Sequence, residues 1–135
     1  MKTILITLTL SITLFGCIDK SDESNQQEKS IYGQWNLIKY EPGFSPTEHF
    51  NSGEITWTFH SDYSLSVIIE NNTKINDGIP LNTSGKYTYT INDNELLFDN
   101  NLNFEYKVVN NELILSSLIG LEADGKRITF LKVAE

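Results

Sequence analysis

The sequence predicts an all-β protein: an eight-stranded antiparallel up-and-down barrel that follows a signal peptide and a flexible linker. Three observations lead to this prediction. After residue 30, apolar residues alternate with polar ones, turn signals of Asn, Asp and Gly separate the alternating segments, and no segment of useful length has helical periodicity. Short hairpin connections favour a meander over a sandwich of the same strands. Closing the meander into a barrel removes the exposed edges that an open sheet would leave.

The composition narrows the class of protein. A chain of 135 residues has room for one domain, and its formal net charge is -8 with a pI near 4.7. The ten Lys and Arg residues are scattered singly, whereas a nucleic-acid groove needs a basic stripe. We therefore expect no nucleic-acid partner. The oligomeric state stays open at this point.

Residues 1–16 have the pattern of a secretory signal peptide. Lys2 precedes an apolar run from Ile4 to Phe15, which is too short to span a bilayer. The segment Leu14-Phe15-Gly16-Cys17 resembles the lipobox of bacterial lipoproteins, in which the cysteine becomes the new N-terminus and is acylated. The resemblance implies lipidation of Cys17 by long chains such as palmitate, and hence a membrane partner. The alternative is an ordinary secretory signal with a chance cysteine.

Residues 17–30 comprise the lipidated cysteine and a linker that is charged, rich in Ser and Gln, and without an apolar period. By resemblance to the sorting rules of other lipoproteins, the lack of Asp after Cys17 favours the outer membrane. The acidic cluster Ser21-Asp22-Glu23 resembles surface-export signals, but it suits a solvated linker equally well. Whether the domain faces the periplasm or the cell surface stays open.

The domain itself occupies residues 31–135 and contains eight expected strands. A first strand opens with Gly33-x-Trp35, and long connections over residues 41–52 and 71–83 interrupt an otherwise tightly turning chain. The strands are expected near residues 33–40, 53–60, 63–70, 84–91, 95–99, 102–109, 112–121 and 126–133.

The second and third strands form a predicted hairpin with one apolar face. Because the apolar series has odd parity on both sides of His60-Ser61-Asp62, a three-residue loop would pair Phe59 with Tyr63 and Trp57 with Leu65. In this register Phe59 and Tyr63 would plug the closed end of the barrel.

Two later turns carry a predicted register as well. Asn110-Asn111 suits a two-residue type I′ turn, because Asn tolerates positive φ, and would pair Val108 with Leu113. Asp124-Gly125 is a second hairpin signal. A two-residue turn there would pair Leu121 with Ile128.

The segment Ile31-Tyr32-Gly33-Gln34-Trp35 resembles the Gly-x-Trp signature of the lipocalins. The patterns ITWTF, SGKYTYTI, NNELIL and DGKRITFLK resemble the small lipocalin-like domains of many bacterial lipoproteins, so that the resemblance covers nearly all of residues 31–135. It implies a barrel that binds a small hydrophobic ligand. In lipocalins a basic residue late in the last strand packs on the signature Trp. Lys132 is therefore expected to lie over Trp35 as a cation–π partner, the alternative being a solvated terminal Lys.

In a meander the connections between strands alternate between the two ends of the barrel. The long connections over residues 41–52 and 71–83 are therefore expected to surround one open end, the mouth. Trp35 and the linker to the membrane are expected at the opposite end. The candidate ligand pocket consists of inward positions near this mouth and of two loop residues above them. The inward positions are Ile55, Trp57, Val67, Ile69, Tyr87, Phe104 and Tyr106, and the loop residues are Phe44 and His49. An aromatic-rich lining suits a small apolar ligand. The same residues would also fill a solid barrel, and the domain would then be a structural, protein-interaction or glycan-interaction module of the cell envelope.

The sequence gives little basis for catalysis. His49 and His60 are assigned to opposite ends of the barrel and so cannot share a metal or an acid–base step. The run Asn92-Asp93-Asn94 lacks the spacing of a calcium loop. We therefore expect no enzyme activity, no cofactor and no metal.

Overall fold

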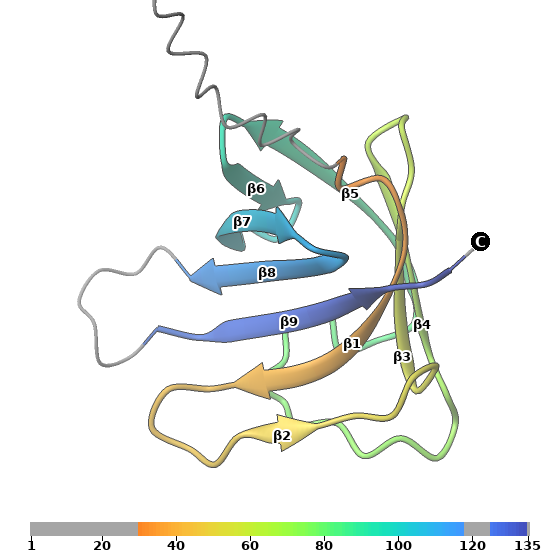
Figure 1. The fold of residues 1–135 in the computed structure, drawn as a ribbon, viewed down its shortest axis with the longest axis vertical. Coiled ribbons are helices and arrows are strands. Elements are labelled where there is room, and N and C mark those ends of the chain that lie inside the picture. The colour runs from red at the N-terminus through yellow and green to blue at the C-terminus, as the bar shows by residue number, and fades with distance from the viewer. Residues whose placement is uncertain (1–29, 118–124, 135) are drawn as a thin grey trace, which may run out of the picture.

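The computed structural model describes residues 30–117 and 125–134, and in them the chain forms a closed antiparallel barrel of eight strands with one short strand added (Figure 1). The predicted signal peptide, the predicted lipidation site Cys17 and the predicted linker up to residue 29 lie outside these residues. The strands are β1 (Gly33–Glu41), β2 (Glu48–His49), β3 (Ile55–Phe59), β4 (Ser64–Ile69), β5 (Gly85–Asn92), β6 (Glu95–Phe98), β7 (Asn103–Val109), β8 (Glu112–Ser117) and β9 (Arg127–Lys132). The described residues contain no helix that could cross a membrane.

The pairing of β1 with β9 closes the barrel. Around it, the strands follow the chain from β1 through β3 to β9, each antiparallel to the next. The eight predicted strands are thus confirmed. The ninth, β2, pairs with the last part of β1 through Lys39–His49 and Tyr40–Glu48. It was not predicted, because two residues are too few to show a period of two.

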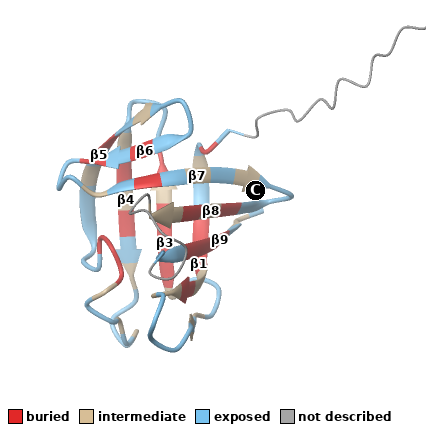
Figure 2. Cartoon of the chain, turned by 90° about the vertical axis from the view of Figure 1, so that its left-hand side faces the viewer, coloured by how far each residue is buried: buried red, intermediate tan, exposed pale blue. Residues whose placement is uncertain are grey.

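Side chains of one parity fill the barrel, as the alternating pattern predicted. Figure 2 shows buried and exposed residues alternating along the strands. The buried apolar residues from the strands, the loops and the entry of the chain form one cluster: Ile31, Trp35, Leu37, Tyr40, Ile55, Trp57, Phe59, Leu65, Val67, Ile79, Leu81, Tyr89, Leu96, Phe98, Phe104, Leu113, Leu115, Ile128 and Phe130.

The turn at Asn110-Asn111 confirms its prediction. Val108 pairs with Leu113, and the two asparagines have φ angles of 49° and 72°. Both central residues therefore adopt the left-handed conformation that a type I′ turn requires. This matches the local twist of β7 and β8.

The predicted register of the β3–β4 hairpin is wrong by two residues. Phe59 pairs with Leu65 and Trp57 with Val67. The loop is longer because the Asp62 carboxylate accepts hydrogen bonds from the amide and hydroxyl of Ser64, at 3.0 and 2.6 Å, and so holds a local turn. Tyr63 has a φ of 63° and is 52% exposed. It lies on the surface and does not plug the barrel.

The predicted register of the last hairpin is wrong by six residues. Ile128 pairs with Leu115, not with Leu121, and Phe130 pairs with Leu113. The last pair is Ser116 with Arg127, so the connection is longer than the turn expected at Asp124-Gly125. Leu121 and residue 124 lie outside the described residues.

The two ends of the barrel differ in their connections. The loop end carries the connections after β1, β4, β6 and β8, and the turn end carries those after β3, β5 and β7. Ser30, where the described chain begins, and Lys132 lie at the turn end, since the Lys132 amide donates to the Asn111 carbonyl at 2.8 Å.

Candidate functional site

Trp57 occupies the middle of the barrel and is fully buried. Its ring packs against Phe130, Phe98 and Phe59, with ring centroids 4.9, 5.8 and 6.2 Å away. A side chain with no surface open to a water-sized probe lines no cavity that water could fill. The predicted pocket residues Ile55, Val67 and Phe104 are also in the core, exposed by 1–3%. The structure brings these residues together as packing partners.

The loop between β4 and β5 covers the loop end of the barrel. Ile79 and Leu81 are 3% and 7% exposed, and they pack on the core cluster. The Tyr40 hydroxyl donates a hydrogen bond of 2.7 Å to the Gly78 carbonyl. Burial, together with the nearby Glu48 carboxylate, raises the pKa of Tyr40, so the phenol stays protonated as a donor. The expected open mouth is thus capped by the chain itself.

Three other predicted pocket residues are half-buried. Ile69 and Tyr87 pack on the margin of the core near the loop end. Tyr106 was expected near the mouth, but its amide donates to the Asn94 carbonyl at 2.8 Å, which places it at the turn end. The physical reason is the stagger between neighbouring strands of a barrel: Glu95 pairs with Glu105, so β7 runs past the start of β6.

The two residues expected above the mouth lie elsewhere. Phe44 is 80% exposed and does not pack on the core. His49, on β2, is exposed and borders a groove on the outside of the barrel. Both differ from the prediction because β2 pairs with β1 and so carries this connection along the outer wall.

The signature residues at the turn end form the predicted cluster. Lys132 Nζ lies 4.5 Å from the centre of the Trp35 ring, which confirms the cation–π contact, and also donates to the Tyr32 carbonyl at 2.6 Å. The Trp35 indole donates to the Ile31 carbonyl at 2.7 Å. Gly33 has a φ of 113°, and a Cβ there would lie 3.0 Å from Lys132 Nζ. The positive φ favours glycine at this position, and any larger residue would also displace the Lys132 ammonium from its place over Trp35.

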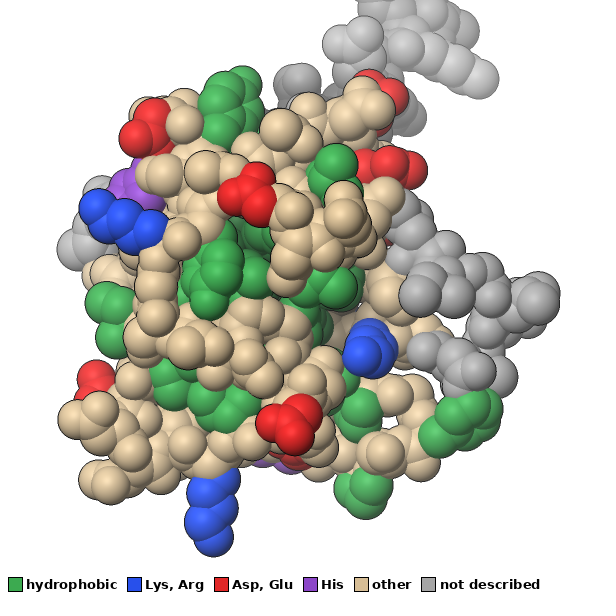
Figure 3. Space-filling view, turned by 180° about the vertical axis from the view of Figure 1, so that it is seen from behind, with side chains coloured by type: hydrophobic (Ala, Val, Ile, Leu, Met, Phe, Trp, Pro, Cys, Tyr) green, Lys and Arg blue, Asp and Glu red, His purple; other side chains and the backbone are tan. Residues whose placement is uncertain are grey.

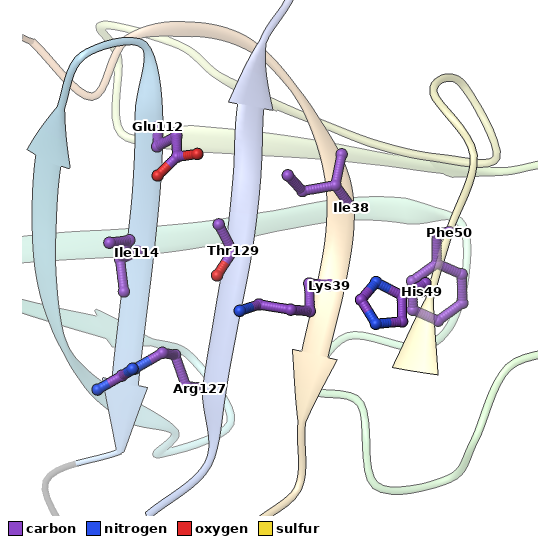
Figure 4. A pocket seen from close by; sticks show the side chains of 8 residues that line it. All are labelled: Ile38, Lys39, His49, Phe50, Glu112, Ile114, Arg127 and Thr129. Atoms are coloured by element: carbon purple, nitrogen blue, oxygen red, sulfur yellow. The ribbon is translucent and has the colours of Figure 1, made fainter. Parts of the chain in front are cut away.

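A groove of about 530 Å³ crosses the outer face of β8, β9, β1 and β2 (Figure 4). Its apolar part is formed by Ile38, Ile114 and Phe50, and Thr129 lies between them. Polar side chains complete the lining: Lys39, His49, Glu112 and Arg127. A groove of this volume is within the range of small-molecule and peptide sites.

A β-bulge in β1 creates one wall of this groove. Leu37 pairs with Phe130 and Lys39 with Thr129, so Ile38 is the extra residue. The bulge reverses the parity of the strand: Trp35 and Leu37 are buried before it, and Tyr40 is buried after it. Ile38 and Lys39 both line the outer groove as a result.

Sequence reasoning missed the groove, although one signal was present. The inward series Trp35, Leu37 continues at Tyr40 and not at residue 39, and such a break in parity within one strand is typical of a bulge. The partners across the groove, Thr129 and Arg127, come from the far end of the chain. Only the closure of the barrel brings them beside β1.

The two histidines lie on separate elements of the described part of the chain. No group of three His, Asp or Glu side chains there is placed to hold a metal ion. His60 lies at the turn end, within 3.1 Å of the Ser66 hydroxyl, while His49 is on β2. The contact between His60 and Ser66 is exposed to solvent.

The fold defines the chain as a small antiparallel β-barrel protein. A family-model comparison and a comparison with curated proteins found no match. Among solved structures, the chain is similar to an uncharacterized protein from Bacteroides eggerthii DSM 20697, with 12% identity and a TM-score of 0.52, over 77% of this chain and 100% of that one. At this identity the similarity shows the fold alone.

Proposed function

We propose that this chain is a lipid-anchored protein of the bacterial outer membrane whose barrel is a solid scaffold for contacts made on its outer surface. The observation that carries the proposal is the position of Trp57: it is fully buried, and three other aromatic rings surround it. The cap formed by Ile79 and Leu81 supports the same reading, since both are buried over the loop end. A barrel filled in this way presents its partners with an outer wall, not with a cup.

The anchor rests on the sequence. The apolar run that ends at Gly16-Cys17 predicts acylation of Cys17, and the charged, Ser- and Gln-rich composition of residues 18–29 predicts a linker between the anchor and the domain. Metabolic labelling with a tagged palmitate tests this point. We expect label on the wild-type protein and none on a Cys17→Ser variant. Label that persists in the variant would refute lipidation at this residue.

The solid interior has its own test. A fatty acid or an environment-sensitive hydrophobic dye, titrated into the folded protein, is expected to leave Trp57 fluorescence unchanged. A saturable response that Trp57→Phe abolishes, with the fold intact by circular dichroism, would show that a ligand enters the barrel.

The second candidate function is the binding of a small hydrophobic ligand in the barrel, as the lipocalin-like pattern implies. Two observations favour it. The Trp57 indole N–H is buried without a hydrogen-bond partner among the described residues, and hydrophobic side chains show in a recess on the back of the molecule (Figure 3). For this function the loop that carries Ile79 would have to move away from the core. The dye titration separates the two candidates.

A further inference from the structure

The outer groove carries a local positive charge on an acidic protein. The chain has a formal net charge of -8, yet Lys39 and Arg127 both line the groove, against the single carboxylate of Glu112. Within residues 30–117 and 125–134, Lys39 is paired with Glu41 at 3.2 Å, and Arg127 has no ion pair. An exposed guanidinium beside an apolar floor is suited to hold a carboxylate in bidentate geometry.

A second hollow of about 430 Å³ adjoins the groove and shares Arg127 with it. It runs between the loop after β1 and the start of β9, and Lys126 adds another cation there. Its other lining residues are mostly small: Glu41, Gly43, Ser45, Thr47, Ser116 and Gly125. The two hollows meet at Arg127, which lines both.

The side chains labelled in Figure 4 give the two ends of the groove opposite charges. Glu112 lies at one end of the β8–β9 ladder and Arg127 at the other, with Ile114 and Thr129 between them. A ligand with its anionic group at Arg127 would place an apolar group over Ile114 and Ile38 and keep away from Glu112. The groove is open along the β8–β9 ladder from Glu112 to Arg127. An open surface that follows the strands accommodates an extended chain better than a compact molecule.

We propose that this groove binds an acidic, extended peptide segment of a partner protein. A carboxylate of the segment pairs with Arg127, and a neighbouring apolar side chain packs on Ile38 and Ile114. The inference rests on the proposed function, because a solid barrel makes its contacts on the outer wall. Charge complementarity selects the occupant: the acidic protein places three of its ten Lys and Arg residues around two adjoining hollows, against the two carboxylates of Glu41 and Glu112, and this local excess of positive charge suits an anionic partner.

The test uses the full chain in detergent and short fluorescent peptides, read by anisotropy. One peptide alternates glutamate with leucine, the second replaces glutamate by lysine, and the third replaces leucine by serine. We expect the first to bind with a dissociation constant below about 1 mM, which is the upper limit of a useful weak interaction, and the other two to bind at least about tenfold more weakly. Added salt weakens the first interaction.

Single substitutions test whether the peptide binds at Arg127. Arg127→Gln is expected to weaken binding of the glutamate–leucine peptide about tenfold, and Arg127→Lys by less, since lysine keeps the charge without the planar fork. Lys86→Gln makes the same charge change at an exposed residue outside the groove and should bind as the wild type does. Both substituted residues are exposed, so folding is expected to persist and is checked by circular dichroism.

Any of three results would overturn the proposal. The glutamate–leucine peptide could fail to bind, or Arg127→Gln and Lys86→Gln could weaken its binding equally. An oligogalacturonate could instead bind in a way that depends on Arg127 while the peptide does not. The last result would assign the groove to an acidic glycan. None of these results depends on the dye titration or the palmitate labelling. The peptide-binding proposal can therefore fail while the proposal of a solid, lipid-anchored barrel stands, and the reverse.

Discussion

At the scale of single residues, the molecule depends on two tryptophans with different roles. Trp57 fills the centre of the barrel through ring contacts alone, and its N–H has no hydrogen-bond acceptor among the described residues. The Trp35 N–H donates a hydrogen bond to the Ile31 carbonyl, and the Lys132 ammonium lies over the Trp35 ring. The first residue therefore contributes mainly apolar burial, whereas the second ties the entry of the chain to its last strand.

Replacing Trp57 by alanine is expected to destabilise the protein by about 3–5 kcal/mol, the range for large aromatic residues lost from a core. Trp57→Phe should cost less, because it removes the unpaired N–H along with part of the ring. Urea unfolding measures both. Ile68→Ala, at a side chain that is 53% exposed, is the control and should change stability by less than about 0.5 kcal/mol. Equal effects of Trp57→Ala and Ile68→Ala would contradict a packed interior.

Lys132→Met keeps the aliphatic stem but removes the cation from the Trp35 ring and the hydrogen bond to the Tyr32 carbonyl. We expect a loss of about 1 kcal/mol in the free energy of unfolding. Lys107→Met, at an exposed lysine of β7, is the matched control. If both variants lost the same amount, the contact at Trp35 would contribute nothing specific.

At the scale of elements, the hairpins show what a sequence pattern fixes and what it leaves free. Strands for which the pattern specified an inward face, such as β3 and β7, have that face, because an apolar period of two specifies a face. β1 departs from a single parity at its bulge, where the inward series passes from Leu37 to Tyr40. Registers shifted by two or six residues preserve that parity, which is why the errors at Phe59 and Ile128 could not be seen in the pattern. Where the turn residues themselves determine the loop length, as at Asn110-Asn111, the register was predicted correctly.

The loop after β3 supplies a pH-dependent prediction. Hydrogen bonds from the hydroxyl and amide of Ser64 lower the pKa of Asp62, so this carboxylate stabilises the fold above its unfolded pKa, and the contribution is lost as the pH falls through its folded pKa. Asp62→Ala should therefore destabilise the protein at neutral pH and lose most of its effect in strong acid. Unfolding by urea at both pH values measures the difference.

Asp62→Asn provides the control for this experiment. Its side-chain oxygen still accepts hydrogen bonds, but it cannot titrate in this range. Because neither Asn nor Ala titrates, the destabilisation caused by either variant should shrink by the same amount as the pH falls, and Asp62→Asn should cost less than Asp62→Ala at neutral pH because it keeps an acceptor for Ser64. A pH-independent effect of Asp62→Ala would show that the charge of the carboxylate is not what holds this loop.

The capping loop gives a second prediction at this scale. Ile79→Ala removes a side chain that is 3% exposed, and we expect a loss of about 2–5 kcal/mol. Lys74→Ala, in the same loop, removes a side chain that is exposed and should have little effect. A negligible cost for Ile79→Ala in urea unfolding would mean that the loop does not close the barrel in solution.

At the scale of the whole molecule, closure through β1 and β9 decides both the interior and the outer surface. It completes the core around Trp57, and with the bulge at Ile38 it brings Lys39 beside Thr129 and Glu41 beside Arg127. The fold class and the filling residues could be predicted because they depend on local alternation. The groove could not, since it depends on pairing between residues far apart in the chain, on β2 and on the bulge.

Native mass spectrometry of the protein, purified from its own membrane without denaturation, shows whether the barrel is solid. We expect the mass of the mature polypeptide with its acyl groups and no further stoichiometric component. Trp57→Phe should shift this mass by the substitution alone. A small hydrophobic molecule bound one to one in the wild type and absent from the Trp57 variant would contradict a solid barrel.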